Sequence, residues 1–218
     1  MSGSHIVLDL DDTLIHAFFI SQQQLEEINT KSEYSYLKDR IKILHIVDIN
    51  DGDTLGRGDV TIVMIVLRPY LREFLDFIVD YFDNISIWSA GHKRYVRAIE
   101  SVIFPPDNPH YQKKSLKVLS REDCNEITKV SVLKDLASKD FDLFKTLIVD
   151  DNQTTFVKNR GNAIHLPAYN VKLSKDHIMY DDTSLLCIID WIKKNNIKNC
   201  KDVRLVDKKA IFTSAKAK

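Results

Sequence analysis

The 218-residue chain has few cysteines, six glycines, five prolines and no excess of either charge. Its three cysteines, Cys124, Cys187 and Cys200, are odd in number and far apart, which excludes a disulfide framework and a paired-cysteine zinc site. Basic and acidic residues both number 31, so no global field attracts nucleic acid or a membrane surface, and neither is expected as a partner. No apolar run approaches the length of a membrane span, and residues 1–5 do not resemble a signal peptide. We therefore expect an intracellular protein, nuclear or cytoplasmic, that is not secreted.

The length suits one α/β domain with a full core, and no linker interrupts the chain. We predict a single domain over residues 1–200, followed by a basic, frayed tail over residues 201–218.

The most distinctive stretch is Ile6–Leu8, three apolar residues that run directly into Asp9, Asp11 and Asp12. Such a run is typical of a buried parallel strand, which would place Asp9 at the carboxyl edge of the sheet, where ligands bind. Crowded carboxylates oppose one another's ionisation, so a counter-charge is expected, and Mg2+ prefers such oxygen ligands. The alternative is an acidic turn that caps the next helix, with Asp12 or Thr13 as the cap.

The rest of the chain alternates between β-rich and helix-periodic segments. Apolar spacing predicts helices over 71–82, 92–102 and 185–192, a helical start at 134–137, and short strands at 85–88, 116–119, 127–132, 146–149 and 164–166. Runs at 41–47 and 61–67 predict a β-hairpin, which follows a short continuation and a surface excursion over 15–38. We predict an α/β fold with a doubly wound parallel sheet and a hairpin flap after the first strand. The short hairpin lacks a core of its own, so no large cap domain is expected.

Three later positions extend the acidic turn into a possible site. One predicted strand runs into Asp150 and Asp151, another ends at Ser89 and Ala90, and Lys134 lies between them in the sequence. Each has an ordinary interpretation, because acidic pairs cap helices, serine forms turns and single lysines are usually solvated.

Together, and in this order, these residues resemble the haloacid dehalogenase superfamily of phosphotransferases. The segment Leu8–His16 and the Arg-Pro pair at 68–69 resemble, more narrowly, the small phosphatases that act on the C-terminal domain of RNA polymerase II. The likeness covers about residues 6–192. It departs from the family after the last acidic pair, where Asn152 and Gln153 replace the usual Ser-Pro.

The resemblance implies a role for each residue. Asp9 would be the nucleophile that forms an aspartyl-phosphate, and Asp11 would be the general acid and base. The implied Mg2+ ligands are Asp9, Asp150, Asp151 and the main-chain carbonyl of Asp11. The implied phosphate contacts are Ser89, Ala90, Thr13 and Lys134, the last of which also belongs to the catalytic set.

The implied activity is Mg2+-dependent hydrolysis of phosphoserine or phosphothreonine in extended peptides, with the RNA polymerase II tail as a candidate. The alternatives are a phosphatase of a small metabolite or of a nucleic-acid terminal phosphate, and a catalytically dead binding module on the same fold. Arg68 would either form a structural ion pair or contact the substrate.

Overall fold

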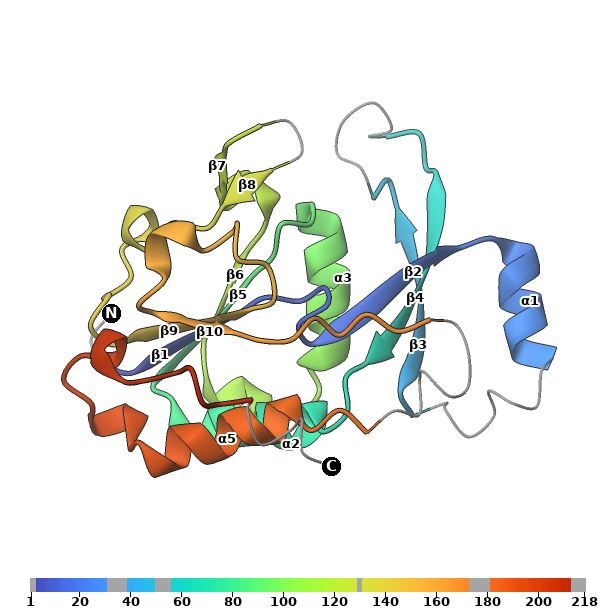
Figure 1. Cartoon of the computed structure of the whole chain (residues 1–218). Helices are drawn as coiled ribbons and strands as arrows, with labels where there is room; N and C mark the ends of the chain where they lie inside the picture. The colour runs from blue at the N-terminus through green and yellow to red at the C-terminus, as the bar shows by residue number, and fades with distance from the viewer. Residues whose placement is uncertain (1–2, 31–38, 50–55, 129–130, 173–180, 213–218) are drawn as a thin grey trace.

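The computed structural model describes residues 3–30, 39–49, 56–128, 131–172 and 181–212. Its centre is a parallel sheet of five strands in the order β10-β9-β1-β5-β6 (Figure 1). The strands are β1 His5–Leu8, β5 Asn84–Trp88, β6 Leu116–Leu119, β9 Thr146–Asp150 and β10 Ala163–His165. The chain builds β5 and β6 on one side of β1, and then β9 and β10 on the other. The direction of winding therefore reverses at β1, which is where open α/β sheets bind ligands.

The register of β1 and β9 brings two acidic turns together. Leu8 lies opposite Val149, and the Asp9 amide donates to the Val149 carbonyl at 3.0 Å. Asp9 therefore leaves the sheet level with Asp150. A shift of one residue in either strand would turn one of these carboxylates toward the opposite face.

The two faces of the sheet have different covers. Ile6 and Leu8 point to the face that packs against α2 Leu71–Tyr81, α3 Lys93–Ile103 and α5 Ser184–Lys194. Val7 points to the other face, as period-two alternation requires, and packs with Trp88 and Leu136. The side chains that pack there lie in or beside three short 3-10 segments, η3 Arg121–Asp123, η4 Leu136–Lys139 and η5 Val157–Asn159. They include Leu136 of η4, Phe156 just before η5 and the partly buried Cys124 just after η3. The predicted α/β fold with a parallel sheet is confirmed. No helix in the described part of the chain is long and apolar enough to cross a membrane.

The insertion after β1 is larger than a hairpin. β2 Ile15–Ile20, β4 Val60–Leu67 and β3 Ile41–Val47 form an antiparallel sheet in that order, with α1 Gln22–Thr30 after β2. We call this sheet the flap. The predicted 41–47 and 61–67 pairing is confirmed, whereas β2 was expected only as a short continuation. The remaining predicted turn and excursion, residues 50–55 and 31–38, lie outside the described residues.

The flap shares a small hydrophobic cluster with the rest of the domain, as expected of an insertion without an independent core. Met64 and Val66 of β4 are buried against Ile28 of α1 and against Tyr169 and Val171, which follow the last strand of the main sheet. This small cluster fixes the flap to the domain. The flap nevertheless remains a sheet at one side of the molecule (Figure 1).

Three further predictions need correction. The strand predicted over 127–132 is instead a small antiparallel pair, β7 Asn125–Glu126 and β8 Val132–Leu133, and the helical start at 134–137 is the 3-10 turn η4. The tail does not fray at residue 201, because Val203 and Ile211 are buried in the main core. Short 3-10 turns η2 Tyr111–Lys113, η6 Ile197–Asn199 and η7 Val203–Leu205 complete the described chain. Residues 213–218 lie outside it.

Candidate active site

Three carboxylates meet at the carboxyl edge of the sheet. Asp9 follows β1, Asp150 ends β9, and Asp151 is the next residue along the chain. One oxygen from each lies within 4.8 Å of the others. Asp9 and Asp150 are buried, whereas Asp151 is partly exposed. The structure thus brings together the two acidic turns that the sequence placed at separate strand ends.

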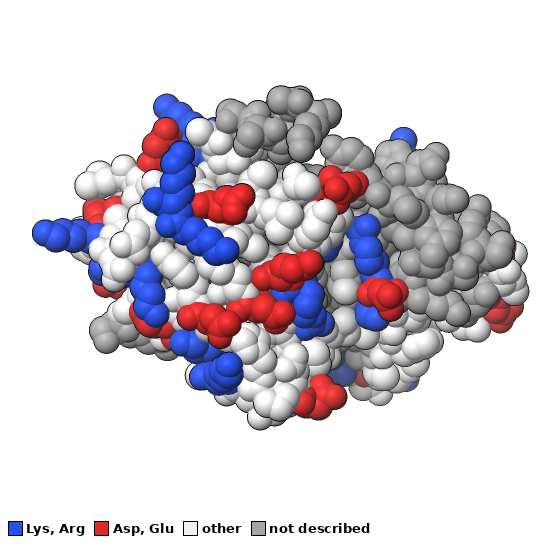
Figure 2. Space-filling model, turned by 90° about the horizontal axis from the view of Figure 1, so that it is seen from below, with Lys and Arg blue, Asp and Glu red and all other residues white. Residues whose placement is uncertain are grey.

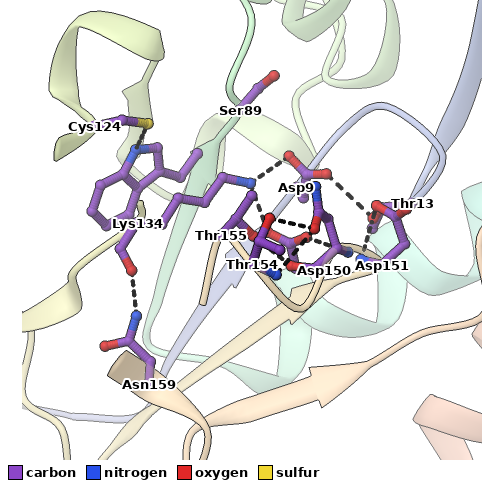
Figure 3. A network of polar contacts seen from close by, with 12 residues as sticks. Asp9, Thr13, Ser89, Cys124, Lys134, Asp150, Asp151, Thr154, Thr155 and Asn159 are labelled. Atoms are coloured by element: carbon purple, nitrogen blue, oxygen red, sulfur yellow. Dashed lines mark hydrogen bonds and ion pairs between the residues drawn. The ribbon is translucent and has the colours of Figure 1, made fainter. Parts of the chain in front are cut away.

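Lys134 is a fully buried cation between two of these carboxylates (Figure 3). Its ammonium lies 2.6 Å from Asp9 Oδ1 and 2.7 Å from Asp150 Oδ2. The ordinary interpretation of a solvated surface lysine is therefore wrong for this residue. The ammonium joins the nucleophile candidate to the second acidic turn.

The backbone around Lys134 is fixed by residues that the sequence did not indicate. The Lys134 amide donates to the Thr155 carbonyl at 2.6 Å, and the Asn159 side-chain amide donates to the Lys134 carbonyl. The Thr155 hydroxyl also donates to Asp150 Oδ2 at 2.8 Å. Threonine and asparagine are common in turns, so no local signal identified either residue.

Thr13 positions the other side of the cluster. Its buried hydroxyl lies 3.4 Å from Asp9 Oδ2 and 3.2 Å from Asp151 Oδ1, and it accepts the Asp151 amide at 3.2 Å. The Thr13 amide also donates to the Leu10 carbonyl at 3.2 Å, so these contacts give Thr13 a structural role, and the phosphate contact that the resemblance implied remains a prediction. The helix-cap alternative is not observed, because residues 15–20 form a strand.

Burial governs the protonation of the site. It raises the pKa of Asp9 well above the ordinary value, and the Lys134 ammonium opposes that shift. Burial alone would lower the pKa of Lys134, but Asp9 and Asp150 raise it, so this ammonium stays charged. The pKa of Asp151 is raised by burial and then by the charge of Asp150. The cluster thus holds one permanent cation among three carboxylates.

Asp11 stands apart from that cluster. Its carboxylate accepts a hydrogen bond from the Tyr95 hydroxyl, which comes from α3. Burial raises the pKa of Asp11, and the bond from Tyr95 offsets part of that rise. Tyr95 lies in the helix predicted over 92–102, and the sequence gave its hydroxyl no role. Gly91 leaves room for the Tyr95 ring, because a Cβ at Gly91 would lie 2.7 Å from a ring carbon.

Ser89 and Ala90 lie where β5 ends. The Ser89 hydroxyl is buried and accepts the Gly91 amide at 3.0 Å, which closes the turn and leaves its own proton for another acceptor. Ala90 lines a pocket of about 350 Å3 beside Asp11. The other lining residues are Phe19, Ile49, Gly91, His92 and Tyr95. The predicted phosphate contacts of Ser89 and Ala90 therefore remain predictions, at positions beside the site.

Arg68 has a structural role. Its buried guanidinium donates to the carbonyls of Thr13 and Pro167 at 2.9 and 2.8 Å and pairs with Asp182 at 2.7 Å. Of the two roles that the sequence left open, the ion pair is the one observed. The guanidinium ties the turn after Asp9 to the segment before α5.

The departure at Asn152 changes the loop and leaves the carboxylates in place. The Asn152 amide donates to Asp150 Oδ1 at 2.8 Å, and the Asn152 side chain accepts the Thr154 amide at 3.0 Å. This is an Asx-type turn, in which a side chain closes the loop. The Asn152 main-chain amide is thus a second donor, beside the Thr155 hydroxyl, that orients the Asp150 carboxylate.

The residues present fit Mg2+. Asp9, Asp150 and Asp151 supply convergent oxygen donors, the ligand type that this ion prefers. Three carboxylates also outnumber the single Lys134 ammonium, so a divalent cation would balance the charge. The Asp11 side chain lies outside this group, and the implied ligation by its main-chain carbonyl remains a prediction.

A family model named NLI interacting factor-like phosphatase matches residues 4–204, which is nearly the whole chain. The chain belongs to this family. The resemblance to the phosphatases of the RNA polymerase II C-terminal domain, within the haloacid dehalogenase superfamily, is confirmed by that match and by the relatives that follow.

One relative is a probable C-terminal domain small phosphatase from Dictyostelium discoideum, 26% identical over 201 residues. That alignment covers 92% of this chain and 53% of the relative. Among solved structures, Fcp1, described as an essential RNA polymerase II CTD phosphatase, superposes with a TM-score of 0.61 at 19% identity. The superposition covers 88% of this chain and 50% of the Fcp1 chain. A fission yeast Fcp1 variant bound to beryllium fluoride gives a TM-score of 0.60 at 18% identity over 88% of this chain and 52% of that chain. The chain thus spans about half the length of these relatives, and the structural matches show the fold.

Proposed function

We propose that this family member is a Mg2+-dependent phosphatase that hydrolyses phosphoserine or phosphothreonine in extended peptides. The observation that carries the proposal is the buried Lys134 ammonium shared by Asp9 and Asp150. An enclosed cation between a nucleophile and a metal-ligand candidate is costly to build for stability alone. It suits a site that receives a phosphate dianion.

Asp9 is the proposed nucleophile. Its carboxylate oxygen attacks phosphorus, the ester bond breaks, and an aspartyl-phosphate forms. The Lys134 ammonium contacts Asp9 directly and is placed to stabilise negative charge on the transferring phosphoryl group. Mg2+, when bound by Asp9, Asp150 and Asp151, supplies further neutralisation of the phosphate charge.

Asp11 is the proposed general acid and base. In the first step its proton passes to the leaving alkoxide oxygen, and in the second step the carboxylate takes a proton from the attacking water, which releases phosphate from Asp9. The raised pKa of Asp11 favours the protonated form that the first step requires. Tyr95 holds the side chain on the pocket side of the site.

The open site favours a peptide over a small metabolite. In the described chain, the insertions near the site are the flap and the β7–β8 hairpin, which lie on either side of α3 in Figure 1. The pocket beside Asp11 has an apolar wall that includes Phe19 and Tyr95 and suits an apolar neighbour of the phosphoresidue, such as proline. Contacts of this kind, remote from the reacting atoms, can raise kcat/KM. The activity named for these relatives makes the RNA polymerase II tail the first candidate substrate, which implies a nuclear or cytoplasmic protein.

Two assays test this proposal. The wild type is expected to hydrolyse p-nitrophenyl phosphate in the presence of Mg2+ and to lose this activity in EDTA. The Asp9→Asn variant is expected to be inactive. Full activity in chelator would contradict the metal requirement, and inactivity of the wild type under all these conditions would favour a binding module. Tail-derived phosphoserine peptides are then compared with sugar and nucleotide phosphates. A metabolite that exceeds every peptide by about tenfold in kcat/KM would overturn the assignment to peptides.

A further inference from the structure

The main chain of Asp151 is held by a histidine at the end of the neighbouring strand. Nε2 of His165 donates to the Asp151 carbonyl at 2.8 Å. His165 is the last residue of β10 and lies opposite Asp150 in the register of β9 and β10. The next amide, that of Leu166, donates to the Asp150 carbonyl at 3.1 Å. The end of β10 therefore holds the carbonyls of both acidic residues at the end of β9.

Two side chains fix the orientation of the His165 ring. The Asp151 carbonyl only accepts, so Nε2 carries the hydrogen, and Nδ1 of the neutral ring is left as an acceptor. The Gln153 side-chain amide lies 3.1 Å from Nδ1 and is placed to donate to it. The ring also lies against that of Phe156, with the two centroids 5.8 Å apart. Phe156 is buried in the cluster behind the sheet, so His165 has a partner for each nitrogen and a fixed surface beside its ring.

Asp151 is the member of the carboxylate cluster that is held most by its main chain. The other two carboxylates are buried and share the Lys134 ammonium, whereas Asp151 is partly exposed and its carboxylate has the Thr13 hydroxyl at 3.2 Å. The same hydroxyl accepts the Asp151 amide, and His165 binds the Asp151 carbonyl. The peptide groups on both sides of Asp151 are therefore fixed, one by Thr13 and the other by His165.

This connection passes through one of the two positions at which the chain departs from its family. Gln153 stands where the usual residue is proline, whose ring restricts φ by itself. Here the preceding residue, Asn152, closes an Asx-type turn, and the Gln153 side chain reaches from the loop to His165. Side-chain hydrogen bonds therefore hold the loop that follows Asp151 in this chain.

We propose that His165 and Gln153 are positioning residues for the metal site. They hold the Asp151 main chain so that its carboxylate converges with those of Asp9 and Asp150 on Mg2+. The proposal rests on the metal dependence in the proposed function and adds two residues to it. Hydrogen bonds behind a metal ligand tune the affinity of a site for its ion, because a ligand that turns away binds the ion less tightly.

The test measures Mg2+ binding directly, by isothermal titration calorimetry of the metal-free protein with magnesium chloride. His165→Ala is expected to weaken binding by about three- to tenfold, the effect of one hydrogen bond. The Mg2+ concentration that gives half-maximal hydrolysis of p-nitrophenyl phosphate should rise by the same factor. The KM for p-nitrophenyl phosphate at saturating Mg2+ and the urea midpoint in EDTA should match those of the wild type, because His165 is exposed and is remote from the substrate in this proposal.

Further variants separate the hydrogen bond from the bulk of the ring. His165→Gln carries an amide near the position of Nε2 and should restore most of the lost affinity, whereas the shorter side chain of His165→Asn should not. Gln153→Ala should weaken Mg2+ binding by about two- to threefold in the wild type. It should have no further effect in His165→Ala, because Gln153 acts only through that ring.

His110→Ala is the matched control. His110 is another partly exposed histidine, and its Nδ1 lies 3.1 Å from the Lys113 ammonium. Its Nε2 lies 3.8 Å from Asp80 of α2. Figure 2 shows the face that carries α2 and α5, on which acidic and basic side chains are interspersed. Loss of this imidazole should leave Mg2+ binding unchanged, because it has no contact with the acidic residues at the end of β9.

The outcomes separate the positioning proposal from the proposed function. Equal Mg2+ binding by the wild type and His165→Ala would overturn the positioning proposal and leave the phosphatase proposal standing. A loss that His165→Gln does not restore, or that His110→Ala shares, would also overturn it. Calorimetry does not require turnover, so an inactive protein that binds Mg2+ would refute the proposed hydrolysis while the variants still decide the role of His165. A wild type that binds no Mg2+ would refute both proposals.

Discussion

The Tyr95 hydroxyl donates its hydrogen bond to the Asp11 carboxylate, and this contact holds the proposed acid apart from the cluster of Asp9, Asp150 and Asp151. A single residue separates Asp9 from Asp11 in a turn, yet their side chains have different partners, a cation for one and a phenol for the other. The proposed nucleophile, Asp9, is therefore stabilised by the Lys134 ammonium, and the proposed acid, Asp11, is held separately by the Tyr95 phenol.

Tyr95→Phe tests this division. Loss of the hydroxyl should misplace Asp11 and reduce kcat on phosphoserine peptides by roughly tenfold, with a smaller loss on p-nitrophenyl phosphate, whose leaving group needs little protonation. Because the hydrogen bond lowers the pKa of Asp11, its removal should move the alkaline limb of the pH–rate profile to higher pH. Tyr111→Phe is the control, since the Tyr111 phenol donates to a remote carboxylate, Asp76, at 2.7 Å. Equal losses on both substrates with an unchanged profile would argue against the role of Tyr95.

Lys134→Met tests the electrostatic centre. Removal of the ammonium leaves Asp9 and Asp150 buried without their partner, so the free energy of unfolding in EDTA should fall by roughly 3–5 kcal/mol. The pKa of Asp9, already raised by burial, should rise further. A raised pKa in the folded state favours folding at low pH, so the variant should be more stable at pH 5 than at pH 8. Urea titrations at both pH values measure this, with Lys113→Met as the exposed control; a variant as stable as wild type would contradict the buried pairing.

The ion pair of Arg68 with Asp182 gives a test of stability alone. Asp182→Ala leaves the buried guanidinium without its carboxylate and should lower the free energy of unfolding by roughly 3 kcal/mol. Asp190→Ala, on the exposed side of α5, should change it by less than about 0.5 kcal/mol. Chemical denaturation of both variants provides the comparison. Similar values for the two would show that the buried pair contributes nothing specific.

His5 gives a pH dependence that is separate from the active site. Burial lowers the pKa of His5 from 6.5 to about 4, and its Nε2 lies 2.8 Å from the Ser86 hydroxyl. The unfolded chain then binds the proton more tightly, so stability is complete above pH 6.5 and is lost as the pH falls toward 4, by roughly 3 kcal/mol. His5→Gln, which lacks the titrating ring, should lose less over this range. If the free energies of unfolding of the two proteins fell equally between pH 6.5 and pH 4, His5 would be excluded as the source of the pH dependence.

The sequence pattern predicted the site residues that stand at the ends of strands. Asp9 and Asp150 each follow a continuous apolar run, so their position at one edge of a parallel sheet followed from the fold class. Lys134 could be assigned only by resemblance, because its burial depends on Thr155 and Asn159, residues with no distinctive local pattern. The Tyr95 bond likewise depends on how α3 lies against the turn after β1.

The errors in the fold have similar causes. β2 was missed because Ile15–Ile20 lacks alternation of polar and apolar residues, and its pairing with β4 is a long-range contact. The last turns were missed because the few apolar residues of this basic segment, Val203 and Ile211 among them, follow no helix or strand period and are buried only when the main core exists. Local periodicity contains no information on either arrangement.

The most direct measurement concerns the covalent intermediate at Asp9. Asp11→Asn, mixed with p-nitrophenyl phosphate and Mg2+ and quenched in acid, should accumulate phosphoenzyme, because the good leaving group departs without the acid whereas hydrolysis of the intermediate lacks its base. Borohydride reduction followed by peptide mapping should convert Asp9 alone to homoserine, and the double variant with Asp9→Asn should give no adduct. An adduct on any other residue, or turnover by Asp9→Asn at a rate near that of wild type, would contradict the account.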